Sequence, residues 1–153
     1  MESLRILLAI AANKDLEIHH IDIIMAYLAG ELKEEIYMEP PVGLPNSEQR
    51  VCRLRKGLYG LKQSARVWNQ RIGKKLEQSG MHATNGDHSV WVSHDRGLIL
   101  ALYVDDIVLF ARDMQAIRWM KGILNENFNM KDLGPISTLL GIKIQRNRAQ
   151  GTL

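Results

Sequence analysis

The sequence predicts a single α+β domain in which helices pack against an antiparallel sheet. Two observations support this. Apolar residues recur at helical spacing in three segments, and short strand-like apolar runs lie between turn signals. Helices and strands mix without regular βαβ alternation, which favours a two-layer α+β arrangement over a parallel sheet. With 153 residues, the chain is long enough to bury one sizeable core.

Three helices are expected, at residues 2–13, 64–79 and 114–127. Gly80 follows the second helix directly and is a typical helix terminator. Each segment has one apolar face, formed in turn by Leu4, Leu7, Leu8 and Ala11, by Trp68, Ile72 and Leu76, and by Ile117, Met120, Leu124 and Phe128.

Strands are expected wherever a short apolar run is bounded by turn residues. Residues 40–49, which hold three prolines, are expected to form a loop. The expected strands are 16–23, 35–40, 51–56, one on each side of the turn Asp95-Arg96-Gly97, 107–111 and 139–145.

The segment LYVDDIVLF, residues 102–110, places Asp105 and Asp106 inside an apolar run. A two-residue hairpin turn at this pair is the simplest local explanation, because Asp is a good turn residue. A bound cation is the alternative, because Mg²⁺ prefers carboxylate oxygens and would remove the repulsion between the pair. Asp22 is the best candidate for a further ligand, because it also ends a strand-like apolar run. Three such carboxylates suggest two-metal phosphoryl chemistry.

Positive charge is concentrated in residues 50–75, which contain nine Lys or Arg and no Asp or Glu, although the whole chain carries only +3. A segregated basic stretch is typical of proteins that bind a polyanion such as nucleic acid. The alternative is a solvated basic helix face.

No apolar run approaches the roughly 18–20 residues needed to span a membrane. The N-terminal apolar stretch lacks the basic start and cleavage site of a signal peptide. The single Cys52 cannot form an internal disulfide, which fits a reducing compartment. We therefore expect an intracellular protein, cytoplasmic or nuclear, with no membrane partner and no secretion.

Four blocks of the sequence resemble the reverse transcriptase of copia-type retrotransposons. They are HHIDIIMAYLAGELKEEIYMEPPVG (19–43), VCRLRKGLYGLKQSARVW (51–68), YVDD (103–106) and FNMKDLGPISTLLGIKI (128–144). Their order and spacing fit that family across about residues 3–146. The resemblance implies a polymerase palm-like antiparallel sheet backed by helices, with partial fingers and with the carboxylates on the open face. Residues 1–146 would form this domain and 147–153 a tail.

The resemblance also implies the chemistry. Asp22, Asp105 and Asp106 match the aspartates that bind two Mg²⁺ ions, with Mn²⁺ as an alternative. Lys131 matches a lysine proposed to protonate the leaving pyrophosphate. The reaction would be attack by a primer 3′-hydroxyl on a deoxynucleoside triphosphate.

Further positions match the family's binding residues. Tyr27, Tyr59, Gly60 and Gln63 would line the nucleotide pocket, with Tyr27 under the sugar. The positions that match contacts to nucleic acid are Lys62, Arg66, Leu140 and Gly141. The implied partners are an RNA or DNA template with its primer, a dNTP, and other segments of a retrotransposon polyprotein. For the polar side chains among these positions, the alternative to a binding role is simple exposure to solvent. For Tyr27, the alternative is a structural role as an aromatic residue of the core.

The match is incomplete near Asp22, because Ile24 and Met25 replace a usual lysine and a polar residue. Only 21 residues precede Asp22, and no thumb or RNase H is recognised after residue 146. We therefore expect the isolated chain to bind Mg²⁺ and nucleic acid weakly and to extend primers poorly. The alternative function is a catalytically inactive nucleic-acid-binding remnant or a domesticated retrotransposon-derived protein.

Overall fold

The computed structural model describes residues 2–43 and 50–153, and the chain divides into two compact units. The first, here called the sheet unit, comprises the described residues of 1–24 and 75–153. The second, the hairpin unit, comprises those of 25–74. Residues 44–49 of the predicted 40–49 loop lie outside the described residues. Among the helices described, none combines the length and apolar character needed to cross a membrane.

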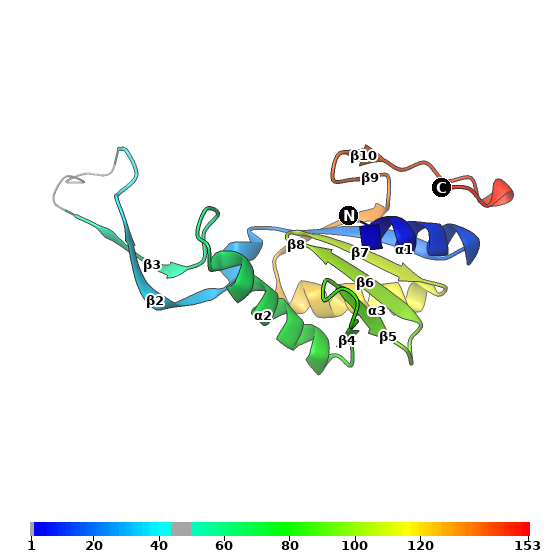
Figure 1. Cartoon of the computed structure of the whole chain (residues 1–153), viewed down its shortest axis with the longest axis horizontal. Coiled ribbons are helices and arrows are strands. Elements are labelled where there is room, and N and C mark those ends of the chain that lie inside the picture. The colour runs from blue at the N-terminus through cyan, green and yellow to red at the C-terminus, as the bar shows by residue number, and fades with distance from the viewer. Residues whose placement is uncertain (1, 44–49) are drawn as a thin grey trace. The chain divides into compact units, whose positions relative to one another are not determined.

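The sheet unit is built on a six-stranded sheet in which every neighbouring pair is antiparallel. The predicted α+β class is therefore confirmed (Figure 1). The strands lie in the order β4 (His82–Ala83), β5 (Val90–Ser93), β6 (Leu98–Tyr103), β7 (Asp106–Ala111), β1 (Glu17–Ile23) and β8 (Met130–Pro135).

Two helices of the sheet unit, α1 (Glu2–Asn13) and α3 (Met114–Asn127), cover opposite faces of the sheet. The buried side chains of α1 cluster with Ile18 and with residues of β7. Lys121 of α3 instead contacts His19, which points to the other face because side chains alternate along a strand. The face expected to be open is thus partly covered, because α1 packs on the same side as Ile18.

The C-terminal part of the sheet unit differs from the prediction of one strand at 139–145. Two short strands, β9 (Thr138–Leu139) and β10 (Ile142–Lys143), form a separate two-stranded hairpin. Leu140 and Gly141 make its turn, with φ of 48° and 79°. Positive φ at both central residues is the backbone of a tight hairpin turn, and a glycine adopts it without strain. The prediction missed this because Leu140 gives no turn signal.

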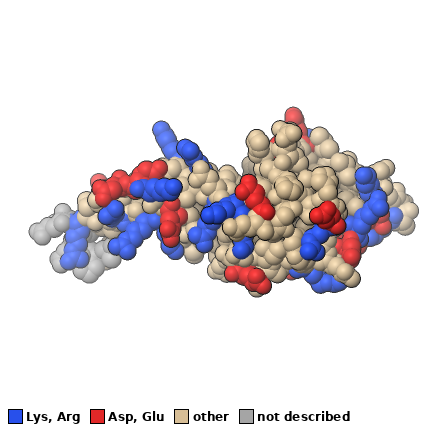
Figure 2. All heavy atoms as spheres, turned by 90° about the horizontal axis from the view of Figure 1, so that it is seen from below, with Lys and Arg blue, Asp and Glu red and all other residues tan. Residues whose placement is uncertain are grey.

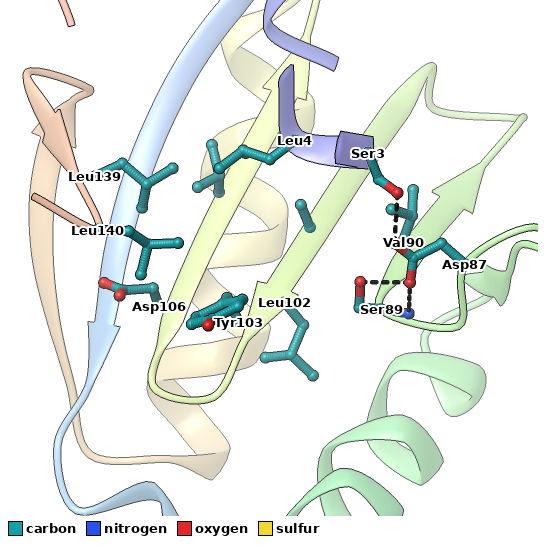
Figure 3. Close-up of a pocket in the computed structure, with 12 residues that line it drawn as sticks. Ser3, Leu4, Asp87, Ser89, Val90, Leu102, Tyr103, Asp106, Leu139 and Leu140 are labelled. Atoms are coloured by element: carbon teal, nitrogen blue, oxygen red, sulfur yellow. Dashed lines mark hydrogen bonds between the residues drawn. The ribbon is translucent and has the colours of Figure 1, made fainter. Parts of the chain in front are cut away.

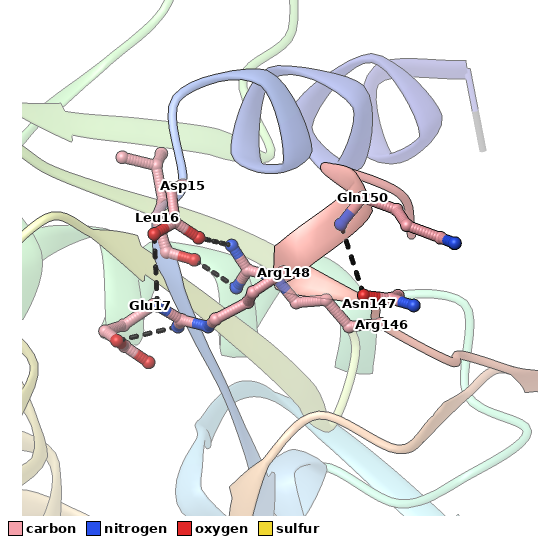
Figure 4. A network of polar contacts seen from close by, with 7 residues as sticks. All are labelled: Asp15, Leu16, Glu17, Arg146, Asn147, Arg148 and Gln150. Atoms are coloured by element: carbon pink, nitrogen blue, oxygen red, sulfur yellow. Dashed lines mark hydrogen bonds and ion pairs between the residues drawn. The ribbon is translucent and has the colours of Figure 1, made fainter.

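Residues that follow β10 are fastened to the start of β1 by two arginines (Figure 4). Arg146 donates to the carbonyl of Leu16 and, at 2.7 Å, to the carboxylate of Asp15. Arg148, in η3 (Arg148–Gln150), reaches Glu17 at 2.7 Å. These contacts tie the C-terminal segment to the strand that carries Asp22.

The hairpin unit contains η1 (Ala26–Ala29), the antiparallel pair β2 (Glu31–Met38) and β3 (Cys52–Lys56), and most of α2 (Ser64–Gln78). The strand predicted at 35–40 corresponds to β2, which begins earlier, at Glu31, and ends at Met38, before Pro40. Trp68 and Ile72 of α2 are buried, as their spacing predicts.

Candidate functional site

A row of four side chains crosses the sheet unit at one end of its central strands. Tyr103 of β6 lies opposite Asp106 of β7, Asp106 lies opposite Asp22 of β1, and Asp22 lies opposite Lys131 of β8. Directly opposed residues share a face, and their Cβ atoms lie about 4.5–5.5 Å apart. Three residues predicted from distant parts of the sequence, Asp22, Asp106 and Lys131, are therefore neighbours.

The third predicted aspartate, Asp105, lies in the turn of the β6–β7 hairpin. The prediction of a turn at Asp105-Asp106 is wrong by one residue: the turn is Val104-Asp105, and Asp106 begins β7. The Asp105 carbonyl accepts a hydrogen bond of 2.7 Å from the N–H of Ile23. This bond fixes the hairpin turn against the end of β1, one residue beyond Asp22.

His20 contacts the predicted site, although the sequence suggested no role for it. Its Nε2 lies 2.6 Å from Oδ1 of Asp106, and the Asp106 side chain remains 27% exposed. His20 is two residues before Asp22 on the same strand, so both side chains point to one face. The two-residue spacing between His20 and Asp22 was the only sign in the sequence that His20 could lie near the site. It becomes informative only once the pairing of β1 with β7 is known.

Carboxylate oxygens of the kind that Mg²⁺ prefers are present in this row, because Asp22 and Asp106 face each other across two strands. The side chains are not drawn together into a complete ligand set, however. Over residues 2–43 and 50–153, no group of three or more His, Cys, Asp or Glu side chains could hold a metal ion. The donor chemistry and the strand register fit a divalent cation, but the geometry does not assemble its ligand shell.

A small cavity lies between the hairpin turn, the N-terminus of α1 and the segment around β9 (Figure 3). Asp106, Tyr103 and Leu140 line it, and Leu140 does so from a turn rather than from the predicted strand. Its volume is about 40 Å³. A water needs about 10–15 Å³, so the cavity has room for only a few waters and none for a nucleotide.

A second carboxylate, Asp87, lines the far side of this cavity and is held by serine side chains (Figure 3). The Ser3 hydroxyl donates to it at 2.6 Å, and the N–H and hydroxyl of Ser89 donate at 2.9 and 2.7 Å. These hydrogen bonds lower the pKa of Asp87 to about 2. Asp87 therefore links the first turn of α1 to the loop before β5.

The face covered by α3 carries its own polar cluster, formed by His19, Lys121 and Asp132. The Lys121 ammonium lies 2.8 Å from Nδ1 of His19 and 2.7 Å from Asp132. Burial and the charge of Lys121 lower the pKa of His19. Burial raises the pKa of Asp132, but hydrogen bonds from Lys121 and from the N–H of Gly134 outweigh it and leave that pKa below its usual value. This cluster fastens α3 to β1 and β8 on the side away from Asp22.

The predicted nucleotide-pocket residues lie in the hairpin unit, where two of them are in contact. The rings of Tyr27 and Tyr59 have centroids 4.5 Å apart, tilted by 49°. Gly60 has a φ of +94°, a left-handed conformation that favours glycine. Ser64 supports this loop by donating a hydrogen bond of 2.6 Å to the carbonyl of Leu58. Tyr59 remains 61% exposed, so the pair forms a partly open aromatic surface.

The other predicted contacts of this unit lie in or just before α2. Lys62 and Arg66 are exposed, and Gln63 is half-buried. Among these residues, only Arg66 lies within the helix. Their positions are compatible with the predicted contacts to template or nucleotide, but nothing in the structure brings them into a common site.

The basic stretch is less segregated in space than in sequence. β3, which carries Arg53, pairs with β2, which contains three acidic residues and is followed by Glu39. Arg53 lies 3.0 Å from Glu35 of β2. Figure 2 shows Lys and Arg side chains interspersed with Asp and Glu along this part of the molecule. Sheet pairing thus mixes charges that the linear sequence separates.

Comparison with known proteins assigns the chain to a family. The family model described as reverse transcriptase (RNA-dependent DNA polymerase) matches residues 1–153. The retrovirus-related Pol polyprotein from transposon TNT 1-94 of Nicotiana tabacum is 40% identical over 158 residues, which cover 100% of this chain and 12% of that polyprotein. The corresponding polyprotein from transposon RE2 of Arabidopsis thaliana is 34% identical over 94% of this chain and 10% of its own length.

A yeast relative shows similar agreement. The truncated transposon Ty1-A Gag-Pol polyprotein of Saccharomyces cerevisiae is 32% identical over 94% of this chain and 12% of its own length. The chain thus spans about a tenth of the length of these relatives. The copia-type resemblance seen in the sequence is confirmed, and the chain belongs to the reverse transcriptase (RNA-dependent DNA polymerase) family.

Proposed function

We propose that the chain contributes the catalytic core of an RNA-directed DNA polymerase, acting as one segment of a retrotransposon Pol polyprotein. The observation that supports this most directly is the row Tyr103–Asp106–Asp22–Lys131, with Asp105 in the adjoining turn. The row has Asp22 and Asp106 on one face of the sheet, beside Lys131.

In the proposed reaction, the primer 3′-oxygen attacks the α-phosphorus of a dNTP. A bond forms between these atoms, and the bond to the oxygen that bridges the α- and β-phosphates breaks, releasing pyrophosphate. Asp22, Asp105 and Asp106 would hold Mg²⁺ or Mn²⁺, which would favour the ionised primer hydroxyl and neutralise charge on the phosphates. Lys131 is exposed beside Asp22, and in this proposal it gives a proton to the leaving pyrophosphate.

The remaining predicted residues bind the substrates in this proposal. The partly exposed aromatic rings of Tyr27 and Tyr59 offer apolar contact area for a base or sugar. Gly60 and Gln63 complete the nucleotide site. Backbone at a glycine can approach a ligand closely because no Cβ intervenes.

The template and primer would be contacted by Lys62 and Arg66 and by the turn Leu140-Gly141. The support for including this turn is that Leu140 and Asp106 line the same small cavity, so the turn lies close to the proposed cation ligand.

A second candidate function is nucleic-acid binding without catalysis. The observation that favours it is the end of β1, where Ile24 and Met25 are 39% and 62% exposed. Apolar side chains there offer no hydrogen bond or charge to a triphosphate. Binding would then rest on contacts to phosphates of nucleic acid, which are strongly salt-dependent.

Primer extension by the full chain separates the two candidates. The assay uses an RNA template, a DNA primer and dNTPs, with Mg²⁺ or Mn²⁺, and it compares the wild type with Asp106→Asn. We expect weak extension that the substitution abolishes. Wild-type binding to an RNA–DNA hybrid that falls with salt, without any extension, would favour the second candidate and contradict the first.

A further inference from the structure

We propose that His20 is a positioning residue that fixes the Asp106 carboxylate in one orientation for a divalent cation. The inference rests on the proposed function, in which Asp106 is a cation ligand. It goes beyond that function by assigning a role to a residue outside the set of aspartates.

The strand register explains why His20 can reach Asp106. Asp22 lies opposite Asp106, and His20 lies opposite Val108, so the side chains of His20 and Asp106 are diagonal neighbours on one face. Nε2 of His20 lies 2.6 Å from Oδ1 of Asp106. The two strands are adjacent in the sheet, so the contact is built on rigid elements.

Burial holds the imidazole in place. The His20 side chain is only 9% exposed, whereas the Asp106 side chain is 27% exposed. The donor is thus anchored in the protein, and the acceptor retains access to solvent. This is the arrangement expected when a fixed group orients a ligand that has to meet a cation from outside.

The chemistry of the contact also leaves one oxygen available. An ionised carboxylate only accepts hydrogen bonds, so the hydrogen must be on Nε2 of His20. A bond to a charged acceptor is short and strong, which fits a separation of 2.6 Å. With Oδ1 held by His20, the rotation of the carboxylate is restricted, and Oδ2 remains for the cation. Groups that orient metal-binding carboxylates in this way typically strengthen metal binding.

The neighbouring His19 provides a matched control. As a whole residue it is 7% exposed, as His20 is, and it lies on the same strand. Its side chain points to the opposite face, where it contacts Lys121. A substitution at His19 therefore disturbs the burial of an imidazole without touching the Asp106 carboxylate.

The test is a titration of the full chain with Mn²⁺ alone, following free Mn²⁺ by electron paramagnetic resonance. The variants are His20→Ala, His20→Gln, His20→Asn, His19→Gln and Asp106→Asn, with folding checked by circular dichroism. We expect His20→Ala to bind Mn²⁺ about 10- to 100-fold more weakly than the wild type. His20→Gln should lose less than His20→Asn, because the glutamine amide reaches the position of Nε2 and the asparagine amide does not.

The outcomes distinguish this inference from the proposed function. If Asp106→Asn abolishes Mn²⁺ binding but every folded His20 variant binds like the wild type, the inference is wrong and the metal site stands. If His19→Gln weakens binding as much as the His20 variants do, the effect is general and the inference is also wrong. If the wild type shows no binding that Asp106→Asn removes, both the metal site and the role of His20 are refuted. Because the glutamine and asparagine variants keep a polar side chain, the comparison remains available if His20→Ala does not fold.

Discussion

Replacing Asp87 by asparagine removes a charge that three hydrogen bonds stabilise. The Ser3 hydroxyl donates to Oδ2, and the N–H and hydroxyl of Ser89 donate to Oδ1. Asparagine keeps the shape of the side chain but loses the negative charge and one of the two acceptor oxygens. The link between the first turn of α1 and the loop before β5 should therefore weaken.

The size of the effect follows from the pKa of Asp87, which falls from 3.8 to about 2. At about 1.4 kcal/mol per pKa unit, the shift corresponds to an upper limit of between about 2 and 3 kcal/mol. Partial solvent exposure screens these interactions, so we expect Asp87→Asn to lower the free energy of unfolding by about 1 kcal/mol at neutral pH. The folded-state pKa lies below the unfolded one, so the stabilisation is complete above pH 3.8 and disappears as pH falls through about 2.

Urea unfolding of the wild type and Asp87→Asn, from neutral pH down to about pH 2, measures this difference. Asp95→Asn is the control, because Asp95 is an exposed aspartate in the turn between β5 and β6. The gap between wild type and Asp87→Asn should close as pH falls, and Asp95→Asn should track the wild type. A gap that is absent at neutral pH, or that persists unchanged down to pH 2, would show that the hydrogen bonds to the charged carboxylate are not its source.

Three further substitutions test particular contacts. Gly57→Ala places a Cβ 2.7 Å from the carbonyl oxygen of Tyr27, so it should lower the melting temperature, whereas Gly122→Ala, with nothing within 4 Å, should not. Gly141→Ala, at φ +79°, should cost about 1–2 kcal/mol in a urea titration. Burial and the adjacent Lys121 hold the pKa of His19 below 6.5. Lowering the pH through 6.5 should therefore destabilise the wild type more than His19→Gln. Equal losses of stability in the two proteins would contradict this.

Helices were predictable here because their signals are local. The segment 114–127 coincides with α3, and the residues of its apolar face are buried. The strand β8 was not predicted, because Met130–Pro135 shows no alternation of apolar and polar residues. It forms by pairing with β1, with a register shift between His20 and Ile21, and such pairing is a tertiary effect.

The candidate site was only partly predictable, for a related reason. Asp22, Asp105 and Asp106 stand out because carboxylates are unusual at the ends of apolar runs. Lys131 was predicted from the family resemblance, but its place opposite Asp22 and the contact of His20 with Asp106 depend on strand pairing, which a single sequence does not specify. The basic stretch shows the same limit, because the acidic strand beside β3 is identified only by pairing.

The one-residue error at the β6–β7 turn shows why register matters for this site. Val104 occupies the first turn position with φ 53°, a conformation that costs a residue with a Cβ about 1–2 kcal/mol. A turn at Asp105-Asp106 would avoid that strain at Val104, but it would shift the pairing of the two strands. In the observed register Asp106 is the first paired residue of β7 and lies opposite both Tyr103 and Asp22, whereas a turn at Asp105-Asp106 would remove Asp106 from the β6–β7 pairing. The strained turn at Val104-Asp105 thus leaves Asp106 at the first paired position of β7, opposite Tyr103 and Asp22 and in contact with His20.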